Sequence, residues 1–135
     1  MREIKFRAFV KHLGQLANVL SIDFLDSEVE IYLVDRYEIR KYRFGEDEIV
    51  LLPFTGLKDK NGKEIYAGDI VRGKYGKNGI VKNYEIRWLI GHFAAVDRNN
   101  ITGDEHYYPI GLLEGEVIGN IYENKYLFEG VNNES

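Results

Sequence analysis

Along most of the chain, apolar and polar side chains alternate with a period of two, the pattern of a strand with one buried face. Near the N-terminus, for example, Ile4, Phe6 and Ala8 alternate with Lys5 and Arg7. Similar stretches predict extended segments over residues 4–8, 17–24, 29–33, 35–44, 48–54, 70–75, 80–90, 93–96, 106–110 and 116–122. Short strands at close spacing, separated by glycine-containing turns, predict a mainly β protein built as a small barrel or sandwich.

Two of these segments carry more specific expectations. Residues 15–20 also have the spacing of a helix, but Ser21–Phe24 alternates, which favours a strand with Val19 and Ile22 in the core. The segment 35–44 is rich in charge on both faces, which is typical of an edge strand protected against pairing with another chain.

The stretch Phe54–Val71 organises the chain around two turns. Asn61-Gly62 predicts a type I′ hairpin turn, which needs positive φ at both central residues. Gly68 follows an alanine and precedes an aspartate, in a second turn that needs a left-handed residue. We therefore expect positive φ at Gly62 and Gly68, and we expect the preceding strand, residues 48–54, to end at Pro53.

This stretch, Phe-Thr-Gly-Leu-Lys-Asp-Lys-Asn-Gly-Lys-Glu-Ile-Tyr-Ala-Gly-Asp-Ile-Val, resembles the signature of the YopX family of phage and prophage proteins. Residues 1–9 and 116–124 resemble the opening and closing motifs of the same family, although Phe9 stands where the family commonly has tryptophan. The resemblance implies a small β-rich protein of bacteriophage or prophage origin, with an N-terminal β layer followed by an SH3-like barrel. It implies no activity, and no catalytic residue is carried over from the family.

Composition agrees with a folded chain of one or two small units. The 135 residues are 44% hydrophobic, which is too apolar for a disordered chain. We divide them into an N-terminal β-rich segment 1–47, a barrel 48–128 and a polar tail 129–135, or one compact unit. The chain has no cysteine, no membrane-spanning apolar run and no signal peptide, so we expect a cytoplasmic protein in a bacterial host and no membrane partner.

Catalytic and metal-binding motifs are absent from the sequence. The three histidines, His12, His92 and His106, lack the spacing of a zinc site, and there is no cysteine to complete one. The run Gly103–His106 places two carboxylates beside an imidazole, but neighbouring residues of an extended chain point to opposite faces, so a solvated loop is favoured over a metal site. We expect no metal, no cofactor and no enzymatic activity.

One local charge pattern suggests a binding site. The segment 70–88 carries five cations and one carboxylate in a protein whose net charge is −4. Small barrels that bind single strands combine such basic residues with aromatic stacking platforms. The candidate residues for nucleic-acid binding are Arg72, Lys74, Tyr75, Lys77, Lys82, Tyr84, Arg87 and Trp88. In the favoured alternative, Trp88 and one tyrosine belong to the core and the lysines only solvate the strands.

We expect a protein-interaction module that docks a host or phage protein through an exposed edge or an aromatic groove. The alternative is a nucleic-acid-binding barrel that uses the segment 72–88, and a hydrolase has the least support. The exposure of Trp88 distinguishes the first two, because an exposed ring beside the lysines favours nucleic acid. Tyr84 is expected to be the cleaner position for a substitution that tests stacking.

Overall fold

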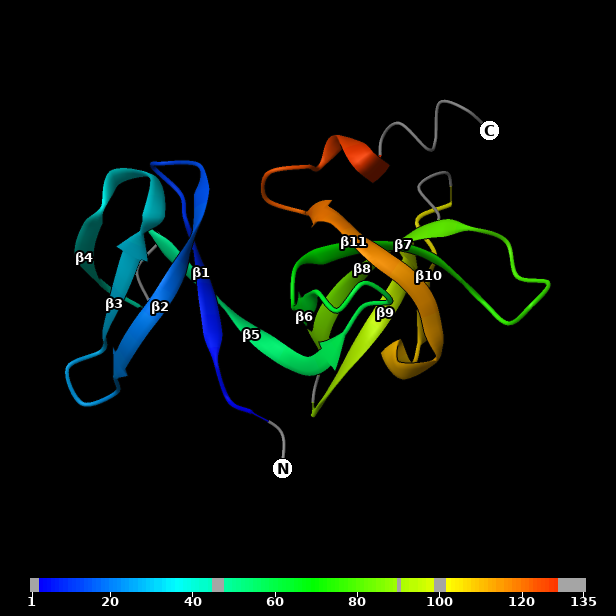
Figure 1. The fold of residues 1–135 in the computed structure, drawn as a ribbon, viewed down its shortest axis with the longest axis horizontal. Coiled ribbons are helices and arrows are strands. Elements are labelled where there is room, and N and C mark those ends of the chain that lie inside the picture. Colours follow the sequence, from blue (N-terminus) through cyan, green and yellow to red (C-terminus); the bar gives the residue numbers. More distant parts are fainter. Residues whose placement is uncertain (1–2, 45–47, 90, 99–101, 129–135) are drawn as a thin grey trace. The chain divides into compact units, whose positions relative to one another are not determined.

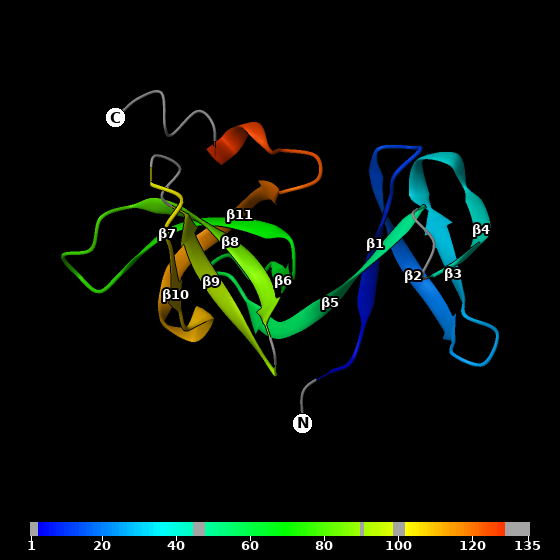
Figure 2. The ribbon, with the colours of Figure 1, turned by 180° about the vertical axis from the view of Figure 1, so that it is seen from behind.

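The protein was analysed as a computed structural model that describes residues 3–44, 48–89, 91–98 and 102–128. These residues form antiparallel strands with two short 3₁₀ turns, so the expected mainly β fold is confirmed (Figures 1 and 2). The strands are β1 (Phe6–Val10), β2 (Gln15–Asp23), β3 (Glu28–Leu33), β4 (Glu38–Arg43), β5 (Ile49–Lys58), β6 (Glu64–Tyr66), β7 (Asp69–Tyr75), β8 (Lys82–Leu89), β9 (His92–Arg98), β10 (Glu105–Tyr108) and β11 (Leu113–Asn120). The 3₁₀ turns are η1 (Val34–Arg36) and η2 (Ile110–Leu112).

The chain divides into two compact units, Met1–Phe54 and Thr55–Ser135, here called unit 1 and unit 2. The strand β5 begins in unit 1, where it pairs with β1, and ends in unit 2, next to β6. The strand continues through Pro53, so the expected end at this residue is wrong. Proline lacks a backbone N–H group, and the strand therefore loses one hydrogen-bond donor there without ending. The boundary between the two units lies after Phe54, whereas the sequence analysis places it after residue 47. Residues 45–47 are outside the described part of the chain.

Unit 1 is a sheet in the order β4-β3-β2-β1-β5, and the charged strand β4 lies at its edge as expected. One face of this sheet forms a core of small and branched side chains, namely Ala8, Val10, Ala17, Val29, Ile31, Leu33 and Ile49. The register shifts between Val19 and Ser21, so Val19 and Ile22, three residues apart, both pack against this core. The strand interpretation of residues 15–20 is confirmed.

Unit 2 contains a second sheet in the order β10-β9-β8-β7-β11, in which β10 is the strand at one edge and β11 the strand at the other (Figure 2). One face of it packs on Ile65 and on η2, and its buried residues are Ile65, Val71, Tyr84, Ile86, Ala95 and Ile110. Ile86 is fully buried in this core, whereas Val81, just before β8, is 49% exposed. After β11 the chain turns, and residues 126–128 begin a helical turn whose Leu127 carbonyl accepts a hydrogen bond from the Asn83 side chain.

The turns of the central stretch agree in part with the sequence. Gly62 and Gly68 have φ of 84° and 89°, which confirms the prediction for both. Asn61 is not among the described residues with positive φ, so the type I′ prediction is wrong. Gly62 N–H donates to the Asp59 carbonyl and Asp59 N–H donates to the Lys63 carbonyl, which is the longer hairpin loop with a single left-handed glycine at its end.

The carboxylate of Asp59 fastens this loop to the second sheet. One of its oxygens accepts the N–H groups of Asn61 and Lys63 at 2.8 and 2.9 Å, and the other accepts the N–H of Val117 on β11 at 2.8 Å. Burial acts to raise the pKa of Asp59, but these three backbone donors outweigh it and hold the pKa below its ordinary value. A single side chain therefore fixes the position of the β5–β6 loop on the outer edge of β11.

The strands β7 and β11 approach each other closely at two facing glycines, Gly73 and Gly115. A Cβ atom built on Gly115 would lie 2.6 Å from the Arg72 carbonyl oxygen and 2.9 Å from Cγ1 of Val71. A side chain at this position would therefore force the two strands apart.

Candidate interaction surfaces

The eight residues proposed from the sequence do not share one face of the second sheet. Opposite partners in the sheet share a face, and successive residues alternate. Because Arg72 pairs with Asn83 and Val71 with Tyr84, the strand residues separate into two groups. Arg72, Lys74 and Arg87 lie on one face, and Tyr75, Lys82, Tyr84 and Trp88 lie on the core face. Lys77 lies in the turn between β7 and β8.

The cations of this group have acidic or polar neighbours. Glu116 and Glu114 of β11 stand directly opposite Arg72 and Lys74. The Lys82 ammonium binds the Asp97 carboxylate at 2.9 Å, and this hydrogen bond raises the pKa of Lys82 above its ordinary value. Much of the local positive charge is thereby balanced within unit 2. Binding of nucleic acid by these eight residues stays a prediction.

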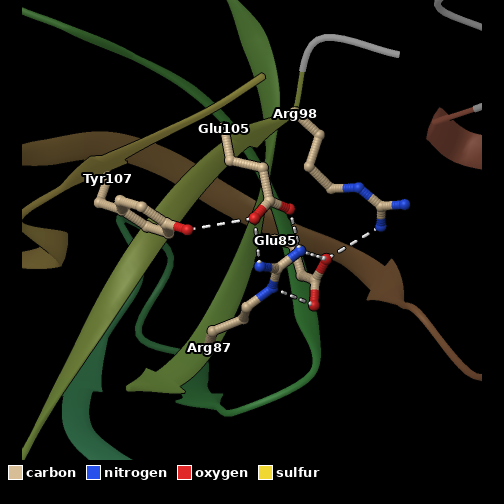
Figure 3. A network of polar contacts seen from close by, with 5 residues as sticks. All are labelled: Glu85, Arg87, Arg98, Glu105 and Tyr107. Carbon is tan, nitrogen blue, oxygen red and sulfur yellow. Dashed lines mark hydrogen bonds and ion pairs between the residues drawn. The ribbon is translucent and has the colours of Figure 1, made fainter. Parts of the chain in front are cut away.

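Arg87 lies at the centre of a polar network on the face opposite the core (Figure 3). Its guanidinium donates to Glu85 of the same strand at 3.0 and 3.1 Å, and to Glu105 of β10 at 2.6 and 3.0 Å. Arg98 of β9 donates to the buried Glu85 at 3.0 Å, and the Tyr107 hydroxyl donates to Glu105 at 3.1 Å. The network joins β8, β9 and the end strand β10.

Electrostatics within the network keep its members charged. The hydrogen bonds from Arg87 and Tyr107, together with the nearby guanidinium charges, hold the pKa of the Glu105 carboxyl below its ordinary value, although desolvation opposes them. The bonds from Glu105 and Glu85 raise the pKa of Arg87. Glu105 belongs to the run Gly103–His106 that was weighed as a metal site, and its carboxylate is hydrogen-bonded to Arg87. Among the residues that the structure describes, no group of three or more His, Asp or Glu side chains could hold a metal ion.

Trp88 lies at the surface, although the favoured sequence interpretation places it in the core, and Tyr84 is buried. Trp88 is 50% exposed, while Tyr84 is 4% exposed and lies in the core, so Tyr84 is not the cleaner position for a surface substitution. The indole ring packs edge-on against Phe93 with ring centroids 4.5 Å apart. Trp88 is six residues from Lys82, roughly 20 Å along the strand, so its exposed ring is not beside that lysine.

The aromatic residues of the core face continue toward the end of β10. Tyr75 contacts the rings of Tyr84 and Tyr108, and its hydroxyl donates to the Pro109 carbonyl at 2.9 Å. Burial raises the pKa of Tyr75 above its ordinary value, so this hydroxyl is a neutral donor. Tyr75 thus holds the segment 108–109 in place.

A hollow of about 300 Å³ opens where β10 ends, between that end and the beginning of β9. Its lining residues are His92, Phe93, Ala94, Tyr107, Tyr108 and Pro109. The last pair between β10 and β9 is Tyr108 with Ala95, and the next residue, Pro109, has no N–H to continue the ladder. Sequence analysis missed this site because its residues come from two separate segments.

A second exposed surface lies on unit 1, at the turn between β2 and β3. Phe24 is 75% exposed and Leu25 is 92% exposed. The turn is held by one Asp23 carboxylate oxygen, which accepts the N–H groups of Leu25 and Asp26 at 2.9 and 3.2 Å. We call residues 23–26 the apolar turn. Its sequence signal is the pair of adjacent large apolar residues Phe24 and Leu25, which follows the alternating segment 17–24.

Comparison with known proteins gives a family and a similar structure. A model of the family described as YopX protein matches residues 5–129. The crystal structure of protein EF1440 from Enterococcus faecalis is similar with a TM-score of 0.60 and 25% identity, over 94% of this chain and 99% of that chain. No curated protein matches the sequence. Within the described residues, no helix has both the length and the apolar character needed to cross a lipid bilayer.

Proposed function

The chain belongs to the YopX protein family, and from this premise we propose that it is an accessory protein of a phage or prophage that works as a protein-interaction module without catalysis. The surface that docks the partner is the apolar turn of unit 1. The partner is a host or phage protein.

The observation that carries this proposal is the exposure of Phe24 and Leu25 on an ordered turn. Large apolar side chains at the surface are costly to leave in water and are the usual anchors of protein interfaces. The hydrogen bonds of Asp23 hold the turn in one conformation, which lowers the entropy that docking would cost.

The charge around the turn indicates the chemistry of the partner. Asp23 and Asp26 border the two apolar residues, whereas Glu28 stands opposite Arg43 in the sheet. A partner surface with an apolar pocket and a rim of lysine or arginine is complementary to this arrangement. Such rim charges mainly raise the association rate, so the interaction should weaken moderately with salt.

The test is affinity capture from host extract with the full chain and a Phe24→Ser, Leu25→Ser double variant, followed by measurement of Kd with the purified captured protein. We expect at least about tenfold weaker binding for the double variant, since buried apolar anchors dominate interface energies. The matched control is Val34→Ser, an exposed apolar residue in the 3₁₀ turn η1 of unit 1, which should bind normally. Equal affinity of the double variant and the wild type would refute the proposal.

The nucleic-acid alternative receives less support. Trp88 is exposed, which favours it, but Arg72, Lys74, Lys82 and Arg87 have carboxylate neighbours and lie on two faces of the sheet. A continuous basic groove beside an aromatic platform is what single-strand binding needs.

We further propose that unit 2 is related to SH3-like barrels. The support is its order of five antiparallel strands, in which four consecutive strands form a meander and the last, β11, returns beside the first, β7, after the 3₁₀ turn η2.

A further inference from the structure

A hollow of about 530 Å³ opens on unit 1 and takes no part in the function proposed for the apolar turn. It is lined by residues of β1, β2 and β3, which are neighbours in the sheet (Figure 1), and by residues of η1. The register between β2 and β3 begins at Asn18 and Tyr32. The hollow extends beyond this pair, between residues 15–17 of β2 and η1.

Three polar side chains form a row along one part of the hollow. Asn18 of β2 stands opposite Arg7 of β1 and opposite Tyr32 of β3. Opposite residues share a face of a sheet, and this face lies away from the core, since the chain neighbours Ala8 and Ile31 belong to the core. Within the described part of the chain, neither the Asn18 amide nor the Tyr32 hydroxyl has a protein hydrogen-bond partner. Both groups are therefore available to a ligand.

Arg7 and Asp35 give the hollow a positive and a negative end. The Gln15 side-chain amide donates to one oxygen of the Asp35 carboxylate at 3.1 Å, which fastens η1 to β2. Among the described residues, Gln15 is the only hydrogen-bond partner of this carboxylate, so the second oxygen can accept from a ligand. Gln15 stands opposite Val10, three residues from Arg7 along β1, so the two charged ends are roughly 10 Å apart along the sheet.

The hollow also has an apolar wall. Leu16 and Ala17 lie between Gln15 and Asn18 on β2, and Val34 lines the hollow from η1, where its side chain is 59% exposed. An apolar group of a ligand would remove this exposed surface from water, which is favourable. The hollow thus combines a cation, an apolar wall and, at its other end, a hydrogen-bond acceptor.

We propose that this hollow binds the C-terminal end of a partner protein that finishes in a large apolar residue. The free carboxylate pairs with Arg7, and Asn18 and Tyr32 donate to the same group. A guanidinium has five N–H donors and can hold a carboxylate through two of them in addition to its contacts within the protein. The apolar side chain of the last residue packs on Leu16 and Val34.

The separation of the two charged ends favours a peptide over a free amino acid. An extended chain rises about 3.3 Å per residue, so a backbone N–H about three residues before the carboxylate reaches Asp35. The carboxylate and the ammonium of a single amino acid are bonded to the same carbon atom, and they cannot contact Arg7 and Asp35 together. Because Gln15 already holds η1 in place, little entropy is lost in ordering the hollow when the peptide binds.

The test uses four labelled hexapeptides, in which Gly-Ser-Gly-Ser-Val is followed by valine, leucine, isoleucine or phenylalanine. Each peptide is made with a free C-terminal carboxylate and as the C-terminal amide, and fluorescence anisotropy with the full chain measures Kd. We expect saturable binding of at least one acid and about tenfold or more weaker binding of its amide, because the amide lacks the charge-assisted contact. This difference should shrink as salt is raised from about 0.05 to 0.5 M.

Variants of Arg7 locate the carboxylate. Arg7→Met should lower the ratio of the amide Kd to the acid Kd to about one, because it removes the contact that distinguishes the two peptides. A purely structural role of Arg7 would weaken both peptides alike and leave the ratio unchanged. Should Arg7→Met not fold, Arg7→Lys keeps the charge without the paired donors and should lower the ratio by about threefold or more. The matched control is Arg43→Met, an exposed arginine of β4 outside the hollow, which should keep the wild-type ratio.

Val34→Ser tests the apolar wall. It should weaken the acid and the amide alike, by about fivefold, because an apolar contact is lost while the carboxylate contact is kept. The Phe24→Ser, Leu25→Ser variant should bind the peptides normally. These two variants thus have opposite effects on peptide binding and on the partner of the apolar turn, which separates this proposal from the proposed function.

Four results would each overturn the proposal. One is the absence of saturable binding below about 1 mM for all four acids, and another is equal affinity of the acids and their amides for the wild type. The third is a wild-type ratio of amide Kd to acid Kd in the Arg7 variants. The fourth is competition by free leucine at the same concentrations as the peptides, which would assign the hollow to a small amino acid instead.

Discussion

Asp59 is the residue with the widest structural effect in the central stretch, because its carboxylate reaches backbone donors in its own loop and in β11. The other motif residues also have structural partners. The Thr55 hydroxyl donates to the Ile65 carbonyl at 2.7 Å, and Asp69 accepts from the Tyr66 N–H at 2.8 Å. The signature of this stretch therefore describes how the turns are built, and it points to no chemistry.

Asp59→Ala should lower the free energy of unfolding by about 1–3 kcal/mol, because three backbone donors lose a charged acceptor. Urea denaturation at neutral pH measures this change. Asn78→Ala, in the exposed turn between β7 and β8, is the control and should stay within about 0.5 kcal/mol of the wild type. A cost below that limit for Asp59→Ala would show that the loop does not depend on this carboxylate.

The pH dependence of stability should also change at this residue. The pKa of Asp59 is lowered in the folded protein, so its stabilising contribution is present above the unfolded-chain pKa of about 3.9 and is lost as the pH falls through the folded pKa. Thermal denaturation of Asp59→Asn should therefore show a shallower loss of stability on acidification than the wild type. Parallel curves for the two proteins would contradict this account.

Single residues differed in how well the sequence predicted them. Positive φ at Gly62 and Gly68 was predictable, because their neighbours define turns locally. The conformation of Asn61 was not, since the choice between a two-residue and a longer loop depends on the bond from Asp59 to Lys63. The burial of Tyr84 and the exposure of Trp88 follow from the pairing register and the strand end, which alternation alone does not reveal.

At the scale of secondary structure, β7 and β11 depend on the two facing glycines. Gly115→Ala should destabilise the protein by about 1–3 kcal/mol, because a new methyl group would overlap the β7 backbone. Gly111→Ala is the matched control, since its Cβ would meet no atom within 4 Å. Chemical denaturation compares the two, and equal stabilities would show that β11 can move away without cost.

The end strand β10 is tied to the sheet by Arg87. Arg87→Met should increase hydrogen exchange of the backbone amides in β10, because Glu105 loses its guanidinium partner while the aliphatic part of the side chain is kept. A double-mutant cycle of Arg87→Met and Glu105→Gln should give a coupling of about 1 kcal/mol, the upper range for a partly exposed pair. A coupling near zero with unchanged exchange would assign the stability of β10 to its aromatic contacts.

Most strands could be predicted from alternation, and the edge position of β4 from its charges. The limits of β5 could not be predicted, because a proline commonly ends a strand, whereas β5 continues through Pro53. The register shift in β2 is visible only as two core residues, Val19 and Ile22, three positions apart. The hollow at β10 required tertiary pairing, because it depends on where β10 leaves β9.

At the scale of the whole molecule, the net charge follows directly from the sequence, but the arrangement of the charges in space does not. The net charge of −4 opposes binding to phosphate backbones, and Arg72, Lys74 and Lys82 have carboxylate neighbours. We therefore expect weak or undetectable binding of single-stranded DNA and RNA at about 0.15 M salt. Fluorescence anisotropy with labelled oligonucleotides tests this expectation.

If submicromolar binding occurs, the affinity should fall steeply with salt. Neutralising Lys74, Lys77 and Lys82 would then flatten the slope of log affinity against log salt by roughly one unit for each lost phosphate contact. Trp88→Ala should weaken the binding at every salt concentration, since stacking releases no counterions. That outcome would favour the nucleic-acid function over the protein-interaction function.

The boundary between the two units falls inside β5, between Phe54 and Thr55, and this has a consequence for proteolysis and for inheritance. Proteases cleave exposed, irregular chain that can adapt to their active sites, and a paired strand is a poor substrate. Limited digestion should therefore spare residues 49–58 and cut elsewhere first. A recombination event at this boundary would sever a strand that both units use, so the two units should be inherited together.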